Sequence, residues 1–135
     1  MPRRTVAALL AAVAAVLFVS GCSNNRESAP ARASRNTGTA TATVAADGVQ
    51  QVVVTGNEQF RFVPSTIDAK AGKLRIVLTN SGGTPHDLKV TGAGQTGLVG
   101  AGEKDQITVT LRPGRHEFVC TLHTRLHMIG TIVVS

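Results

Sequence analysis

Residues 107–134 read ITVTLRPGRHEFVCTLHTRLHMIGTIVV, and the pattern of this stretch decides the fold. Apolar and polar residues alternate over residues 107–111, which places successive side chains on opposite faces of a strand. A Pro-Gly turn signal follows at 113–114, and residues 116–120 form a second alternating run. Residues 132–134 form a last apolar run. The stretch therefore predicts three strands, with a loop between the second and the third.

The same pattern of strands and turns extends upstream to residue 49. Short β-rich runs end at Gly, Pro or Asn at intervals of about 8–12 residues, and no window has the period of a convincing amphipathic helix. The Gly-rich run over residues 91–102 predicts a long connection or a weak strand with loops. These features predict an all-β fold, a β-sandwich formed by residues 49–135.

Length and composition restrict the classes of protein to which the chain can belong. With 135 residues there is room for one domain, and two cysteines make neither a disulfide scaffold nor a four-thiolate metal site. Nine Lys and Arg face six Asp and Glu within residues 49–135, a net charge of +3 without a basic cluster, which argues against nucleic-acid binding. No hydrolytic triad or paired-carboxylate motif is present, so we expect no enzyme activity.

The first 21 residues have the features of an export signal. Arg3 and Arg4 precede 14 unbroken apolar residues, Val6 to Val19, which is too short for a comfortable membrane-spanning helix. The next residues, Val19-Ser20-Gly21-Cys22, resemble a bacterial lipobox, which implies cleavage before Cys22 and a diacylglyceryl group on its sulfur. The alternative is ordinary cleavage that leaves Cys22 as a free thiol. We expect an exported protein, lipid-anchored on the extracytoplasmic face of a bacterial membrane, by either the general or the twin-arginine route.

Residues 22–48 are predicted to form a disordered tether after the lipidated cysteine. The stretch is rich in Ala, Ser, Thr and Asn and has no strand or helix period, so it cannot bury enough apolar surface to offset its ordering entropy. A flexible chain of this length spans roughly 25–30 Å. The alternative is that part of it adds an edge strand. The predicted division is thus 1–21 signal peptide, 22–48 lipidated cysteine and tether, and 49–135 folded domain.

Four residues of the predicted sandwich have the chemistry of metal ligands. Cys120, His123 and Met128 lie within nine residues in the loop before the last strand, and His86 follows Pro85 at a predicted strand start. Soft sulfur ligands together with imidazole select copper, and two His, one Cys and a weak axial Met are the ligand pattern of blue-copper sites. Each residue also has a structural interpretation: a buried apolar cysteine, a core methionine and a surface histidine.

In these motifs the sequence resembles the cupredoxin family, the type 1 blue-copper domains of the plastocyanin and pseudoazurin kind. The resemblance covers about residues 50–135 and depends on the following motifs: Phe60-x-Phe62-x-Pro64, Ala71-Gly72, Asn80, Pro85-His86, Pro113-Gly114 and Cys120-x2-His123-x4-Met128-x-Gly130.

The resemblance implies a Greek-key sandwich of about eight strands. It also implies one type 1 copper ion, with His86, Cys120, His123 and Met128 as ligands. The implied function is transfer of single electrons between redox protein partners, with the edge of His123 as the usual exit. We expect a monomer, and the sequence does not identify the partners.

Two residues depart from the family pattern. Asp87 follows His86 where Asn is common, and its carboxylate is expected to accept from the Thr121 hydroxyl or backbone and to pin two ligand-bearing loops together. His116 stands where Tyr is often found, and we expect a structural hydrogen bond near the Gly114 turn rather than a metal-binding role.

His127 is the main ambiguity in the ligand set. A rival assignment uses His86, Cys120 and His127 and leaves His123 free, at the expense of an unusually long loop between Cys and His. Adjacent residues entering a strand point to opposite sides, so His127 should face away from the metal if Met128 is a ligand.

Two functions with the same ligands are compatible with the sequence. The first is a membrane-anchored type 1 copper protein that carries single electrons outside the cytoplasm. The alternative is a copper-binding lipoprotein for copper storage, delivery or tolerance, without a role in electron transfer. A zinc site or a metal-free adhesion sandwich is the third possibility.

Overall fold

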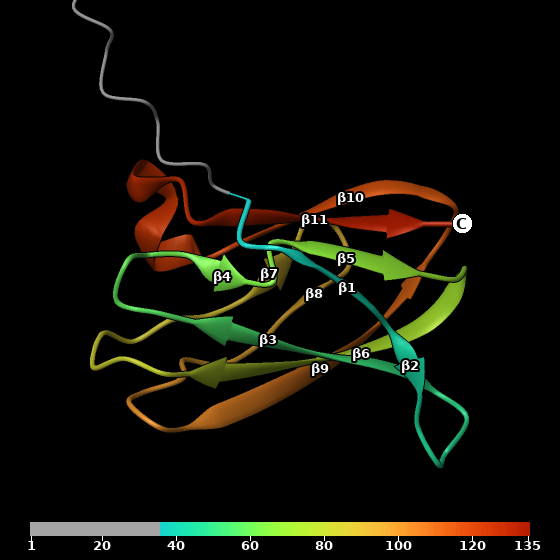
Figure 1. The fold of residues 1–135 in the computed structure, drawn as a ribbon, viewed down its shortest axis with the longest axis horizontal. Coiled ribbons are helices and arrows are strands. Elements are labelled where there is room, and N and C mark those ends of the chain that lie inside the picture. The colour runs from blue at the N-terminus through green and yellow to red at the C-terminus, as the bar shows by residue number, and fades with distance from the viewer. Residues whose placement is uncertain (1–35) are drawn as a thin grey trace, which may run out of the picture.

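The computed structural model describes residues 36–135, which form two β-sheets packed face to face (Figure 1). The first sheet contains six strands in the order β1 (Thr39–Thr41), β5 (Thr66–Ala69), β11 (Ile129–Val134), β10 (Gly114–Val119), β7 (Lys89–Val90) and β8 (Gly94–Gln95). The second sheet contains β2 (Thr43–Val44), β3 (Gln50–Gly56), β6 (Gly72–Asn80) and β9 (Lys104–Leu111) in order, with β4 (Phe62–Val63) paired to β3. The predicted all-β sandwich is confirmed.

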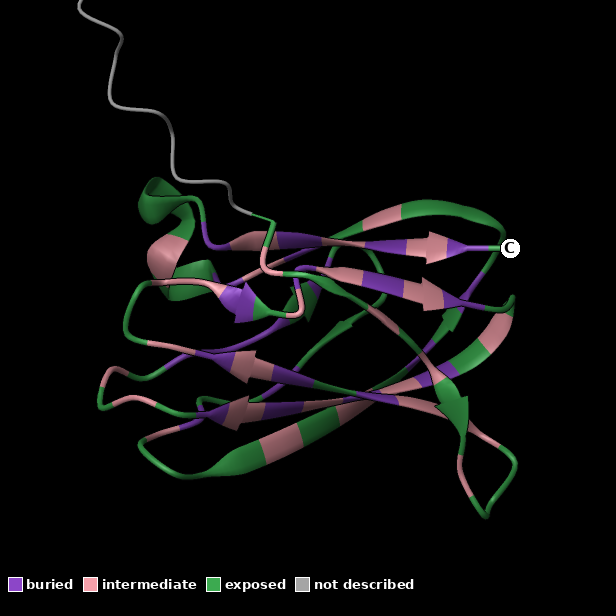
Figure 2. Ribbon diagram, in the orientation of Figure 1, coloured by how far each residue is buried: buried purple, intermediate pink, exposed green. Residues whose placement is uncertain are grey.

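The core forms because the inward positions of these strands are apolar. In β6, Leu74, Ile76 and Leu78 are fully buried while the residues between them are not (Figure 2). Burying each such side chain stabilises the fold by about 1.5–3 kcal/mol. Eight paired positions fix the register of β6 against β9, from Gly72 opposite Leu111 to Thr79 opposite Lys104. A slip of one residue would turn this apolar row outward.

The predicted start of the domain at residue 49 is too late. Residues 39–41 pair in parallel with β5, and residues 43–44 pair with β3, so this short segment joins the open edges of both sheets. The alternative that part of the tether adds an edge strand is therefore correct for these residues. The composition was misleading because the segment is held by backbone pairing and by two small side chains, Ala40 and Ala42, packed against the core.

Strand number and helix content differ in detail from the prediction. Residues 36–135 contain eleven strands instead of about eight, because β2, β4, β7 and β8 are two-residue pairings that no sequence period reveals. The Gly-rich run holds β8 and an isolated bridge between His86 and Val99, as expected for a weak strand with loops. A short 3₁₀ segment, η1 (Thr121–Leu126), lies between β10 and β11 at the end of the sandwich opposite the C-terminus (Figure 1).

The predicted signal peptide, lipobox and Cys22 lie outside the described residues. Within residues 36–135 no helix has the length and apolar character needed to cross a membrane.

Candidate metal centre

Cys120 and Met128 lie at the facing ends of β10 and β11, where the two paired strands separate. The Cys120 N–H donates to the Met128 carbonyl at 3.0 Å and so closes the loop that contains η1. His123 sits at a kink within η1 and donates its N–H to the Cys120 carbonyl at 3.2 Å. The loop ends at His127, whose left-handed backbone (φ 56°) turns the chain back into β11. One closed loop thus carries three of the four predicted ligands.

His86 reaches the same end of the sandwich from the loop after β6. Its backbone exchanges two hydrogen bonds with Val99, of 3.1 Å and 2.8 Å. The buried Asn80 side chain holds the loop that precedes His86 by donating to the carbonyls of Thr84 and Val99 at 2.8 Å and 3.0 Å. These contacts fix the path of the chain into His86.

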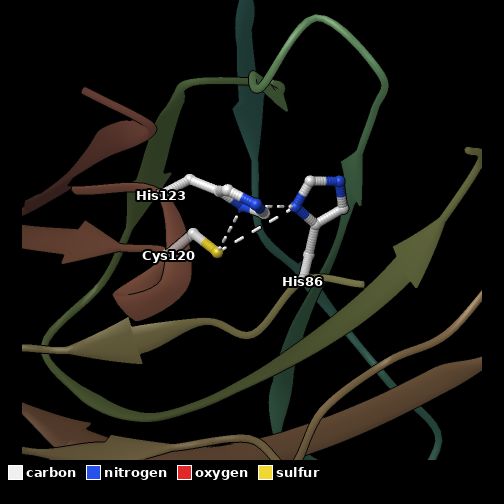
Figure 3. Close-up of side chains that lie close together, drawn as sticks. All are labelled: His86, Cys120 and His123. Atoms are coloured by element: carbon white, nitrogen blue, oxygen red, sulfur yellow. Dashed lines mark hydrogen bonds between the residues drawn. The ribbon is translucent and has the colours of Figure 1, made fainter. Parts of the chain in front are cut away.

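The side chains of His86, Cys120 and His123 converge on one point (Figure 3). The two Nδ1 atoms are 3.2 Å apart, and the Cys120 Sγ lies 3.3 Å from the His123 Nδ1 and 3.9 Å from the His86 Nδ1. A point equidistant from three atoms so placed lies about 2 Å from each, close to the bonds of about 2.0–2.3 Å that metal ions form with imidazole nitrogen and thiolate sulfur. This donor set fits a type 1 copper site.

Burial differs among the four predicted residues. His86, Cys120 and Met128 are completely buried, whereas His123 is half-buried. The Nε2 of His86 is buried and has no hydrogen bond of good geometry. The nearby backbone of Asn57 nevertheless acts to raise the pKa of His86. His123 is therefore the only one of the four that is partly accessible to solvent.

Burial favours the neutral forms of His86 and Cys120. It lowers the pKa of His86, and the neighbouring His123 lowers this pKa further, against opposing effects of the Asn57 backbone, Glu58 and Asp87. Burial also raises the pKa of the Cys120 thiol. A metal ion bound by a thiolate and two neutral imidazoles must displace the thiol proton, so its affinity decreases as the pH falls.

Asp87 connects the two loops that carry the ligands, as expected from the sequence. The carboxylate is buried and accepts from the Thr121 N–H at 2.6 Å and from the Thr121 hydroxyl. The Gln95 side-chain amide also donates to it, at 2.9 Å. Both oxygens therefore serve as acceptors, which holds residues 86–87 against the residue next to Cys120.

The two other histidines lie outside the cluster. The Nε2 of His116 lies 2.9 Å from the Arg112 carbonyl, which confirms the expected structural contact near the Gly114 turn. His127 is exposed while its neighbour Met128 is buried, as the alternation argument predicted. The rival grouping with His127 in place of His123 does not form.

Three residues around the site were not given a role from the sequence. The Phe60 ring packs 4.8 Å from the His123 ring between centroids, and Glu58 accepts from the loop before His86. The backbone of Gly56 lies against the His86 ring, so closely that a Cβ there would come within 2.8 Å of the imidazole Cδ2. Only the Phe60-x-Phe62-x-Pro64 motif pointed to this segment, and it supported the family resemblance without indicating a contact.

Comparison with known proteins agrees with this fold. The family model for the cupredoxin-like domain matches residues 9–134. A search of solved structures finds 350 matching chains. One of them is dithionite-reduced auracyanin from the photosynthetic bacterium Roseiflexus castenholzii, with a TM-score of 0.57, 16% identity, and coverage of 63% of this chain and 96% of that chain. At this identity the likeness concerns the fold alone, and no curated protein matches the sequence.

The family match spans most of the chain, and the donor cluster lies within the matched residues. The chain therefore belongs to the cupredoxin-like family.

Proposed function

We propose that this protein binds one copper ion through His86, Cys120, His123 and Met128 and carries single electrons between redox proteins outside the cytoplasm. The observation that supports this most directly is the triangle of two Nδ1 atoms and one Sγ, with sides of 3.2 Å, 3.3 Å and 3.9 Å. Copper in such a site supplies a one-electron couple between Cu(II) and Cu(I). Met128 is fully buried and its carbonyl accepts from the Cys120 N–H, and its thioether would be the fourth ligand.

The protein groups around the site favour electron transfer over delivery of the metal. Asp87 braces the two ligand-bearing loops, and the Val99 bridge fixes the backbone of His86. A braced site changes little in geometry between two oxidation states, whereas release of the metal requires the loops to open. Storage, delivery or tolerance is therefore the second candidate.

His123 is the proposed exit for the electron. Its ring is half-buried, and Leu122 and Leu126 on either side of it in η1 are 51% and 47% exposed. Exposed apolar side chains next to a partly accessible ligand suit brief contact with a partner protein. The partners are proposed to be redox proteins, with this protein acting as a monomer and not as an enzyme.

We propose further that Cys22 carries a lipid that anchors the protein on the extracytoplasmic face of a bacterial membrane. The support is the Val19-Ser20-Gly21-Cys22 sequence after an apolar stretch of signal-peptide length. Metabolic labelling with a fatty acid tests this, because label on the native chain and none on Cys22→Ser would support the anchor. Equal labelling of both would refute it.

Addition of Cu(II) to the purified protein tests the copper site. We expect one equivalent to produce an intense visible band from thiolate-to-copper charge transfer and a narrow copper hyperfine splitting. Rapid and reversible electron exchange with a small cytochrome would then support the carrier function. A colourless protein with tight Cu(I) binding would favour copper handling, and absence of copper uptake would exclude both functions.

A further inference from the structure

The turn of residues 56–61, which runs from the last residue of β3 to the residue before β4, contains one residue in an unfavourable backbone conformation. Phe60 has a φ of 55°, which a bulky residue rarely adopts. Asn57 holds the turn: its Oδ1 accepts from the N–H of Gln59 at 3.1 Å and of Arg61 at 3.0 Å, and its carbonyl accepts from the Phe60 N–H at 3.0 Å. Strained residues persist only where the surroundings determine them, and they gather at functional sites.

The strained conformation places the Phe60 ring against both imidazoles. Its centroid lies 4.8 Å from that of His123, with the ring planes tilted by 55°. It lies 6.5 Å from that of His86, in an edge arrangement of 78°. Phe60 thus limits the positions that the two histidine rings can take relative to each other.

The same turn fastens the loop that leads into His86. The Glu58 carboxylate accepts from the N–H groups of Gly83 and Thr84, the latter at 3.1 Å, and from the Thr84 hydroxyl at 3.2 Å. These backbone N–H groups lower the pKa of Glu58, as expected for a carboxylate that accepts several hydrogen bonds. The approach is close, since a Cβ at Gly82 would clash with the Glu58 carboxylate.

We propose that the turn of residues 56–61 is a positioning device for the metal centre, in which Phe60 orients the rings of His123 and His86 and Glu58 secures the loop that carries His86. The inference rests on the proposed copper site and assigns a role to residues distant from the ligands in sequence. The turn restricts both histidines in the metal-free protein, so that few side-chain movements accompany metal uptake or release.

The test compares variants of the full-length protein at the two ends of the sandwich. Glu58→Ala removes the carboxylate that accepts from Gly83 and Thr84. Glu58→Gln keeps an acceptor without the charge, and Phe60→Leu keeps an apolar side chain without the ring. Asp47→Ala is the matched control, because Asp47 is also an exposed acid that accepts a backbone N–H, from Val49, in the β2–β3 turn away from η1 (Figure 1). Copper release to a chelator, the visible spectrum and the melting temperature of the metal-free protein are measured for each variant.

We expect Glu58→Ala and Phe60→Leu to release copper roughly tenfold faster, which is the lower end of the effect of losing a residue that supports a metal ligand. The relative intensities of the visible absorption bands should also change. Glu58→Gln should recover part of the loss, and Asp47→Ala should match the native protein. Native release rates and spectra in both Glu58→Ala and Phe60→Leu would overturn the inference. Should Glu58→Ala fail to fold, Phe60→Leu alone decides.

A second measurement separates this inference from the copper proposal. In the metal-free protein, NMR signals of the His86 and His123 rings should be single and sharp, should broaden or double in Glu58→Ala and Phe60→Leu, and should be unchanged in Asp47→Ala. A native protein that takes up no copper but shows this pattern would refute the proposed function and support the positioning device. Histidine signals that no variant changes would overturn the device.

Discussion

The two ends of the sandwich are held together in different ways. At the end with the metal centre, buried polar groups connect the loops. Among residues 36–135, four of the five buried polar residues lie from the end of β6 to the start of β9: Asn80, His86, Asp87 and Thr96. At the other end, the β2–β3 turn is held by a solvent-accessible ion pair between the exposed Asp47 and the half-buried Arg75. Exposed pairs of this kind contribute roughly 0–1 kcal/mol.

This difference indicates where the chain tolerates unfavourable local structure. Burying a polar side chain is unfavourable unless it is hydrogen-bonded. At the site end Asp87 meets that requirement by accepting from Thr121 and Gln95, and Asn80 meets it by donating from its amide, whereas the Nε2 of His86 has no such partner. The β2–β3 turn at the opposite end contains no buried polar side chain. The buried hydrogen bonds therefore serve the geometry of the ligand-bearing loops.

The largest expected effect separates the two histidines of the metal loop. His123→Ala should abolish the charge-transfer colour and weaken copper binding by more than about 100-fold, because a metal ligand is lost rather than an outer partner. His127→Ala should leave the colour and affinity unchanged, since His127 is exposed and outside the cluster. Copper titration monitored by visible absorbance measures both variants.

The opposite pattern, with colour lost only in His127→Ala, would reinstate the rival ligand set. Equal loss in both variants would mean that the loop as a whole collapses. Circular dichroism of the metal-free variants serves as the control for folding.

Sequence patterns predicted the site better than the supports around it. The Cys120-x2-His123-x4-Met128 spacing was informative because all three residues lie on one closed loop, where sequence distance limits spatial distance. His86 could be predicted from Pro85 and the following strand. Its approach to Cys120, however, depends on how strands that are distant in the sequence come together.

Glu58 and Phe60 had no comparable signal. Their roles depend on the left-handed backbone at Phe60 and on contact with residues 83–84, about 25 positions away in the chain. The edge strands at residues 39–44 were expected only as the alternative to a disordered tether, since backbone hydrogen bonds to β5 and β3 require no particular side chain. Long-range backbone contacts are what a pattern of single residues does not encode.

An intermediate effect is expected from the charge of Asp87. Its two oxygens both accept hydrogen bonds, so it acts as a buried carboxylate beside Cys120 and favours the more positive Cu(II) state. Asp87→Asn keeps the shape of the side chain and should raise the reduction potential by tens of millivolts. For a one-electron couple, about 59 mV corresponds to a tenfold change in the equilibrium constant. Asp47→Asn, at the opposite end, should leave the potential unmoved. A native potential in Asp87→Asn, measured by spectroelectrochemistry, would show that the charge is without influence.

The smallest expected effect is the response of the two ends to acid. Hydrogen bonds from Arg75 and the Val49 backbone lower the pKa of Asp47, and those from Gly83 and Thr84 lower the pKa of Glu58, from ordinary values of 3.8 and 4.5. A carboxyl group whose pKa is lower in the folded state adds stability above its unfolded-state pKa and loses it as the pH falls through the folded-state value. Asp47→Asn and Glu58→Gln should each flatten the decrease in unfolding free energy of the metal-free protein below about pH 4.5.

Both effects should be small, because water screens exposed carboxylates. Denaturant unfolding at a series of pH values measures them, and a steeper acid dependence in either variant would contradict the assignment. The two ends should then differ only in copper release, which Glu58→Gln accelerates and Asp47→Asn does not.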